Sequence, residues 1–319
     1  MTSENTISPP KGFKLFMMAV RAYSFPASVI PIIYGSIIAV LFNPGLKFNY
    51  FHFALALIGS VAIHITTNLI NDIYDFKKGI DKEDRDIGIP HGGSQVLSMG
   101  LVSKNFMKVT ALVTTFISVA IGVYLYTQAG IWIVYLSIFG LLSAVYYTAS
   151  PFALKYKALG DIQVFLSFGT GMTLGSYIVQ THEFSWIPVI LSIPFGLLID
   201  AILHSNNIRD LNFDGKFGVK TLPILIGERL SFYFYYFLIL GAYTSIIIFV
   251  ILKLLPWFAL LNLITFPSAL KLLKMLKNYP QDTMARYELG TKHNVMTAQF
   301  NIQFGLALTI GLLISLLFF

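Results

Sequence analysis

The sequence predicts an all-α integral membrane protein with about nine transmembrane helices. Three observations support this prediction. The 319-residue chain is 56% hydrophobic, only 12% of its residues are charged, and its mean hydropathy is +0.72, which is too apolar for an ordinary soluble domain. Apolar stretches recur from Ser24 to Phe319 with only short polar breaks between them. Basic residues are concentrated in alternate breaks, as they are in membrane proteins.

Each predicted span has the length of a membrane-crossing helix. Roughly 20 mostly apolar residues are needed, because the hydrocarbon layer is about 30 Å thick and each helical residue rises about 1.5 Å. The short breaks leave no room for a separate soluble domain, so we expect one polytopic domain over residues 1–319. The predicted spans are Ser24–Phe42, Phe51–Ile70, Met107–Tyr126, Ile131–Ala149, Leu159–Val179, Trp186–His204, Leu230–Ile251, Leu255–Leu273 and Val295–Phe319.

The basic residues predict the orientation of the chain. With a cytoplasmic N-terminus, 20 of the 22 Lys and Arg residues fall on the cytoplasmic side, and only Lys47 and Lys253 fall on the other. This asymmetry follows the positive-inside rule. The N-terminus lacks the apolar core of a signal peptide, so residues 1–23 are expected to form a cytoplasmic segment of a multi-pass protein of the cell inner membrane. Topology thus explains the net charge of +7, and no nucleic acid partner is expected.

Two acidic, Asn-containing segments follow the second and sixth spans, on the predicted cytoplasmic side. The first, residues 68–86, reads NLINDIYDFKKGIDKEDRD, and the second, residues 206–220, reads NNIRDLNFDGKFGVK. Asp72 and Asp210 lie 138 residues apart and are separated by four spans. This repeat predicts two four-helix units around one central cavity, followed by a ninth helix.

The spacing within each acidic segment predicts a metal site. Residues three or four apart on a helix project from one face, as Asp72 and Asp75 would, and likewise Asp210 and Asp214. Clustered carboxylates resist burial unless a cation lies between them, and Mg²⁺ is commonly held by one or two carboxylates together with substrate phosphates. We therefore expect Mg²⁺ as the cofactor, with Asp81 as a further ligand beside these four. The alternative is a run of solvated loop charges, which two matching copies disfavour.

These segments resemble the two hallmark motifs of the UbiA-type intramembrane prenyltransferases, an NDxxD-like first motif and a DxxxD second motif. Asn71, Asp72 and Asp75 match the first motif, and Asp210 and Asp214 match the second. Within that superfamily the chain looks most similar to 1,4-dihydroxy-2-naphthoate prenyltransferases. The similarity spans most of the chain and is carried by NDIYDFKKGID, YYTASPFALKYKALGD, NNIRDLNFDGKFGVKTL, RAYSFPASVIPIIYGS and TAQFNIQFGLAL.

The resemblance implies a Mg²⁺-dependent transfer of a polyprenyl group from an isoprenyl diphosphate to an aromatic acceptor. In that family, Mg²⁺ bridges the acidic motifs to the diphosphate, the allylic C–O bond ionises, and an electron-rich ring captures the carbocation. The implied acceptor is 1,4-dihydroxy-2-naphthoate, prenylated with loss of CO₂ in menaquinone biosynthesis. The loop from Gly88 to Gly100 departs from the basic form usual in naphthoate enzymes. Transfer to 4-hydroxybenzoate, homogentisate or a glycerol phosphate lipid precursor therefore stays open.

Further polar residues near the motifs are candidates for binding or catalysis. Tyr147 offers a π face that favours a cation, so it joins Asp72, Asp75, Asp210 and Asp214 as a candidate catalytic group. The loop residue His91 is left out, because a lone loop histidine is most often solvated. The alternative for the basic candidates is a role as positive-inside anchors, and for Tyr147 a place in an interfacial aromatic belt. The expected diphosphate contacts are Arg21, Asn68, Asn71, Lys155, Asn207, Arg209 and Lys220.

A secondary transporter is the alternative from another functional class. Transporters also combine internal repeats with intramembrane acids that bind cations. Here the acids lie at the ends of the spans, which suits a soluble headgroup attached to a lipid tail better than ion passage across the bilayer. The sequence indicates a lipid bilayer around the protein and no particular protein partner.

Overall fold

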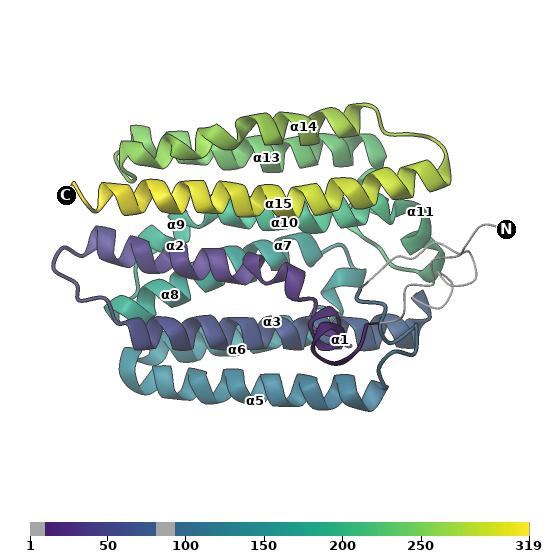
Figure 1. Ribbon diagram of the computed structural model, residues 1–319, viewed down its shortest axis with the longest axis horizontal. Helices are drawn as coiled ribbons and strands as arrows, with labels where there is room; N and C mark the ends of the chain where they lie inside the picture. Colours follow the sequence, from purple (N-terminus) through teal and green to yellow (C-terminus); the bar gives the residue numbers. More distant parts are fainter. Residues whose placement is uncertain (1–9, 81–92, 319) are drawn as a thin grey trace.

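The computed structural model describes residues 10–80 and 93–318. Long helices run side by side along the long axis of the molecule, and the described residues contain no strand (Figure 1). Eight helical segments among them are long and apolar enough to cross a membrane, and a ninth, Ile131–Tyr146, is shorter at 16 residues. The prediction of an all-α membrane protein is confirmed.

The membrane segments include both continuous helices and helices broken by a change of winding. Short elements occupy the connections: α1 (Gly12–Ala19), η1 (Ala22–Ser24), η2 (Leu154–Tyr156), α11 (Leu211–Asp214), η4 (Gly215–Phe217) and α12 (Leu222–Ile226). In chain order, the membrane segments are α2 (Pro26–Phe42), α3 (Tyr50–Lys78), α5 (Lys104–Ala129), α6 (Ile131–Tyr146), α7 (Gly160–Val164) with η3 (Phe165–Gly171) and α8 (Met172–Thr181), α9 (Trp186–Leu191) with α10 (Ile193–Arg209), α13 (Glu228–Ile251), η5 (Trp257–Thr265) with α14 (Phe266–Lys277), and α15 (Thr283–Ser315).

Two predicted boundaries differ clearly from the observed ones. Helix α3 continues for eight residues past Ile70, the predicted end of the second span. It can continue because the polar side chains of the first acidic segment turn inward and avoid lipid. Helix α15 begins at Thr283, 12 residues before the predicted start of the last span, and the predicted end of that span at Phe319 lies outside the described residues.

The interior of the bundle is apolar and closely packed. Tyr34 of α2 and Phe195 of α10 are fully buried, with ring centroids 4.6 Å apart. The Tyr34 hydroxyl donates to the Leu191 carbonyl oxygen at 3.0 Å, so its polar end is satisfied inside the bundle. By contrast, large apolar side chains such as Phe116 on α5 and Ile251 on α13 are more than two-thirds exposed. Outward-facing apolar side chains on the long helices are what a lipid-facing surface requires.

One membrane segment contains a π-helix, η3, between α7 and α8. It crosses α10 so closely that a Cβ added to Gly169 would lie 2.5 Å from the Cα of Gly196. Only glycine permits this approach of two backbones. Single π-helical turns often occur at functional sites, and η3 lines the cavity described below.

Both acidic segments lie at the same end of the bundle. The first occupies the last turns of α3, and the second runs from the end of α10 into α11. Figure 1 shows α11 and the end of α3 at the right of the view, where α1 also lies, whereas the last turns of α15 lie at the left. We call this end of the molecule the acidic end.

Candidate active site

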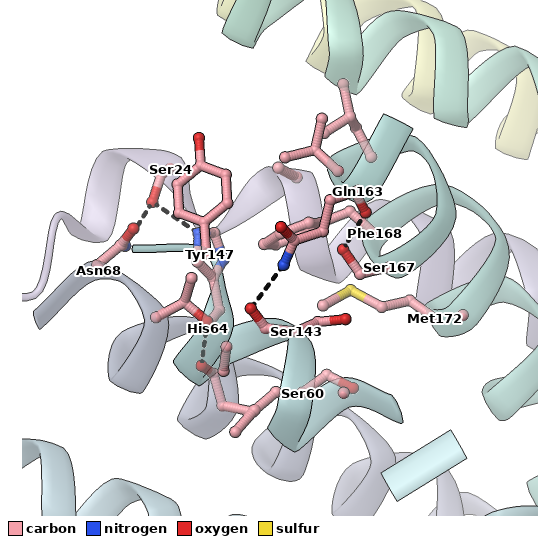
Figure 2. A pocket seen from close by; sticks show the side chains of 18 of the residues that line it. Ser24, Ser60, His64, Asn68, Ser143, Tyr147, Gln163, Ser167, Phe168 and Met172 are labelled. Carbon is pink, nitrogen blue, oxygen red and sulfur yellow. Dashed lines mark hydrogen bonds between the residues drawn. The ribbon is translucent and has the colours of Figure 1, made fainter. Parts of the chain in front are cut away.

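A cavity of about 660 Å³ extends into the bundle from residues of both acidic segments. Along α3, its lining residues run from Asp75 at the acidic end to Leu55 near the start of the helix. Figure 2 shows the middle of the cavity, where side chains such as His64, Ser143 and Gln163 project from different helices. The cavity therefore joins a polar end to a long interior passage.

The first acidic segment presents two buried carboxylates, and one of them, Asp72, is held by Arg21 and Ser94. The Arg21 guanidinium donates to Asp72 Oδ1, and the Ser94 backbone N–H donates to Oδ2 at 3.2 Å. Arg21 adopts a left-handed backbone (φ 55°) between α1 and η1, a strained conformation for a residue other than glycine. Arg21 lines the cavity, whereas Asp72 lies behind it and is not itself a lining residue.

Asp75 is held by two donors from the connection after α6. Lys155 Nζ lies 2.7 Å from Asp75 Oδ2, and the Tyr156 hydroxyl donates to Oδ1 at 2.6 Å. The Lys155 ammonium also donates to Asn71 Oδ1 at 3.0 Å. Burial on its own would lower the pKa of Lys155, but Asp75, Tyr147 and Asp214 together more than offset this effect, so the pKa of Lys155 is raised. Lys155 therefore stays a cation at the edge of the cavity.

The second acidic segment lines the same cavity as the first. Arg209 makes two contacts of 2.6 Å with the two carboxylate oxygens of Asp210. Asp214, at the end of α11, forms no ion pair among the described residues. Burial raises its pKa to about 7, with Asp210 and Asp75 adding to the rise and Lys155 and Arg209 opposing it. The influence of Asp75 and Lys155 on Asp214 shows that the two segments lie within electrostatic reach of one another.

The asparagines differ in what they can offer a ligand. Asn207 and Asn71 both line the cavity. Asn68 donates both of its amide hydrogens within the protein, to the Val20 carbonyl oxygen and to Ser24 Oγ, each at 3.2 Å. Because only Oδ1 of Asn68 is left, it can accept a hydrogen bond or bind a cation but cannot donate to a phosphate oxygen. The geometry therefore favours an indirect role for Asn68 over the direct diphosphate contact expected from sequence.

Of the remaining predicted residues, Tyr147 lines the cavity, whereas Lys220 does not. Tyr147 caps the end of α6 and lines the cavity. Lys220 is exposed and is not among the lining residues; its backbone N–H donates to the Tyr156 carbonyl oxygen at 3.2 Å. The structure thus does not bring the Lys220 side chain to the other candidates. Asp81 and His91 lie outside the described residues.

Several cavity residues were missed by sequence reasoning. His64 lies between two serines, with Nε2 3.2 Å from Ser24 Oγ and Nδ1 2.5 Å from Ser28 Oγ. Ser24 Oγ also donates to the Arg21 carbonyl oxygen at 2.8 Å. Gln163 Nε2 donates to the Ser143 carbonyl oxygen at 2.6 Å. Isolated polar residues inside apolar spans were the available signal for these side chains.

A second buried polar cluster lies behind the cavity. His204 of α10 contacts Asp161 of α7 through Nδ1 and the Ser231 carbonyl oxygen of α13 through Nε2, each at 3.1 Å. Neither Asp161 nor His204 lines the cavity. This cluster joins three helices in the interior. Asp161 ends the segment YYTASPFALKYKALGD, but it was not among the predicted site residues.

The donor set fits Mg²⁺ only when substrate phosphates complete the coordination. Among the described residues, no three carboxylate or imidazole groups lie close enough to hold a metal ion on their own. Asp72, Asp75 and Asp210 are each paired with a basic side chain. Mg²⁺ typically takes one or two carboxylates and fills its remaining positions with water and phosphate oxygens. Oxygen donors beside an open cavity suit that arrangement.

Comparisons with known proteins identify the family of the chain. Residues 28–296 match the UbiA prenyltransferase family. The chain is 30% identical over 303 residues to the 1,4-dihydroxy-2-naphthoate octaprenyltransferase of Bacillus subtilis (95% of this chain, 93% of that protein). It is 31% identical over 308 residues to a UbiA prenyltransferase domain-containing protein 1 homolog of Drosophila melanogaster (92% of this chain, 77% of that protein).

Solved structures share the fold. The apo structure of a UbiA homolog from Aeropyrum pernix K1 matches with a TM-score of 0.66 and 16% identity, covering 93% of this chain and 98% of that one. A UbiA homolog from Archaeoglobus fulgidus bound to DMAPP and Mg²⁺ matches with a TM-score of 0.59 and 15% identity, covering 92% and 99%.

Proposed function

Because this chain belongs to the UbiA prenyltransferase family, and is therefore an integral membrane prenyltransferase, we propose that it prenylates 1,4-dihydroxy-2-naphthoate. A polyprenyl diphosphate is the donor, and Mg²⁺ is the cofactor. The observation that carries the proposal is the meeting of Lys155, Asp75 and Asp214, from three separate parts of the chain, at the polar end of one long cavity. The acidic end lies on the cytoplasmic side of the inner membrane, as the basic residues predict.

Residues at the polar end of the cavity have separate roles in binding the diphosphate, holding Mg²⁺ and stabilising the carbocation. Lys155 and Arg209, both at the cavity edge, pair with diphosphate oxygens and hold the leaving group. Asp75, Asp210 and Asp214 hold Mg²⁺, with Asp72 supporting them from behind Arg21. When bound, Mg²⁺ neutralises the charge that builds on the departing diphosphate. Tyr147 presents its ring to the same space and favours the developing carbocation.

The reaction balances as a substitution on the acceptor ring. The allylic C–O bond breaks, and its electron pair leaves with the diphosphate. A ring π pair forms the new C–C bond at the carbon that carries the carboxylate. The C–C bond between the ring and that carboxylate then breaks and CO₂ departs. The electron pair of this bond stays on the ring and restores its aromaticity. The protein contributes an apolar cavity that keeps water away from the cation.

The decisive experiment gives purified protein one polyprenyl diphosphate and a panel of acceptors, with and without Mg²⁺. We expect a prenylated, decarboxylated naphthalene product by mass, together with stoichiometric CO₂, only when Mg²⁺ is present. Selective prenylation of 4-hydroxybenzoate, homogentisate or a glycerol phosphate would replace the proposed acceptor. Proteoliposomes that move a cation without forming any prenylated product would instead support the transporter hypothesis.

The raised pKa of Asp214 predicts how Mg²⁺ dependence changes with pH. Below about pH 7 Asp214 is protonated, and a protonated carboxyl does not bind Mg²⁺. The Mg²⁺ concentration for half-maximal activity should rise by up to about tenfold per pH unit as the pH falls below 7, and should be flat above it. The metal-free fold should respond in the opposite sense, losing stability as the pH rises from about 4 to 7, because a raised pKa stabilises the protonated form.

Asp214→Asn tests this assignment, because it removes the titrating group while keeping its size. The variant should need a higher Mg²⁺ concentration than the wild type for half-maximal activity at pH 8. That concentration should no longer rise steeply as the pH falls below 7. Titrations of activity against Mg²⁺ at several pH values measure both effects. A wild-type Mg²⁺ requirement that does not change between pH 5.5 and 8 would contradict the role of Asp214.

A further inference from the structure

The cavity runs nearly the whole length of the bundle. Its far end is lined by Leu55, Leu125, Ile133 and Val179. Leu55 and Ile133 lie near the starts of α3 and α6, and Leu125 and Val179 lie near the ends of α5 and α8, all away from the acidic end. From Asp75 to Leu55 the cavity follows α3 for 20 residues, or about 30 Å at 1.5 Å per residue. That length equals the hydrocarbon thickness of a bilayer, about 30 Å.

The far half of the cavity is enclosed by a different set of helices from the near half. Near the acidic end, α10 and α15 contribute lining residues, and the last of these along α15 is Ile302. Ser315, the end of α15, lies 13 residues further on, so α15 does not border the far half. The far half is bounded by α2, α3, α5, α6, η3 and α8, and its lining is mostly small or apolar. A dry passage of this kind suits a hydrocarbon chain.

One face of α6 forms a continuous wall of this passage. Ile133, Ser137, Gly140, Ala144 and Tyr147 all line the cavity and are spaced three or four residues apart, so they share one helical face. A Cβ added to Gly140 would meet nothing within 4 Å. Gly140 lies seven residues from Tyr147, or about 10 Å along the helix. Gly140 therefore leaves open the passage beyond the point where a short prenyl chain would end.

We propose that Gly140 sets the length of the polyprenyl tail that the passage between α3, α5, α6 and α8 accepts. This inference rests on the proposed function and extends it to a residue that selects among donors of different chain length. A dimethylallyl tail occupies only the part of the cavity beside Tyr147. A geranylgeranyl or longer tail passes Gly140 and buries its apolar surface against the far half, which strengthens binding in proportion to the area removed from water.

The test substitutes a large side chain for Gly140. The Cβ of Gly140→Phe enters open space, so its ring is expected to extend into the passage and block it. The ratio of kcat/KM for geranylgeranyl diphosphate to that for dimethylallyl diphosphate should fall at least about tenfold, since the blocked tail loses its apolar contacts. Gly140→Leu, a smaller plug, should give a smaller fall. Leu142→Phe is the matched control, because Leu142 is on the same helix but 48% exposed on the outer surface, and its ratio should not change.

A binding measurement separates this inference from the proposed function. The rise in Tm caused by each diphosphate with Mg²⁺ is measured for the wild type and both Gly140 variants. Loss of protection by geranylgeranyl diphosphate alone supports the passage, even if the wild type prenylates none of the acceptors. Equal protection by both diphosphates in all three proteins would overturn it, because the tail would then lie elsewhere. If Gly140→Phe loses protection by both diphosphates, the Gly140→Leu variant is decisive. Loss of protection by geranylgeranyl diphosphate alone in Gly140→Leu supports the passage, and equal protection by both diphosphates overturns it.

Discussion

Asp72→Asn and Asp210→Asn are each expected to reduce prenyl transfer by about a thousandfold or more. Asp210 lines the cavity as a proposed Mg²⁺ ligand, and an amide does not replace a carboxylate in binding Mg²⁺. Its loss also weakens the bidentate contact with Arg209. Asp72 acts from behind Arg21, and its loss leaves the mostly buried Arg21 guanidinium without its carboxylate partner. Transfer is measured by product mass and diphosphate release at saturating Mg²⁺.

Asp282→Asn provides the matched acidic control. Asp282 is exposed and caps the start of α15 by accepting from the Ala285 N–H at 2.9 Å. Asparagine is an equally good N-cap, so both activity and Tm should be retained. If Asp72→Asn and Asp210→Asn turned over at the wild-type rate, the assignment of the acidic segments would be wrong. If the two variants fell together with Asp282→Asn, the losses would reflect folding.

Lys155→Ala is expected to lower kcat/KM by about a hundredfold to a thousandfold, through the loss of a charge-assisted contact to the diphosphate. It should also lower the Tm, because Asp75 is only 1% exposed and would keep Tyr156 as its only described side-chain donor. Lys155→Arg keeps the charge in a different shape and should recover part of the activity. Steady-state kinetics with the diphosphate as varied substrate, together with thermal unfolding, measure both effects.

Lys157→Ala is the control for this prediction. Lys157 lies two residues away in the same connection, but it is exposed, and within the described part of the chain its Nζ donates only to the Pro151 carbonyl oxygen, at 3.1 Å. It should behave like the wild type in both assays. A Lys155→Ala variant with normal kinetics and normal Tm would mean that Lys155 is an orientation anchor, which was the alternative weighed from sequence.

Much of the architecture could be predicted because hydropathy acts locally along the chain. A run such as Leu230–Ile251 has to bury its backbone in a helix when lipid surrounds it, whatever the rest of the fold does. Its observed bounds, Glu228–Ile251, differ by two residues at one end. Boundaries failed where side chains turned inward, as in α3 after Ile70, because apolar patterning does not distinguish a lipid-facing surface from a polar cavity.

The acidic residues could also be predicted, since their spacing and their repetition are properties of the sequence. What the structure added is which basic residue pairs with each acidic one. Lys155 lies 80 residues after Asp75, yet it contacts Asp75 at 2.7 Å. Lys220 was expected beside the diphosphate, but the structure leaves it exposed. Sequence position near a motif does not determine the direction of a side chain, because the packing of the surrounding helices decides it.

The sequence by itself therefore determined the membrane class, the approximate spans, the two acidic segments and their resemblance to a prenyltransferase family. Each of these depends on composition or on residues within a few helical turns of one another. Only the tertiary structure decided that Asn68 has no donor left for a ligand, that both ring nitrogens of His64 contact serine hydroxyls, and that Gly140 faces an open passage. These properties depend on which surfaces of distant helices meet, and that is settled by packing across the whole bundle.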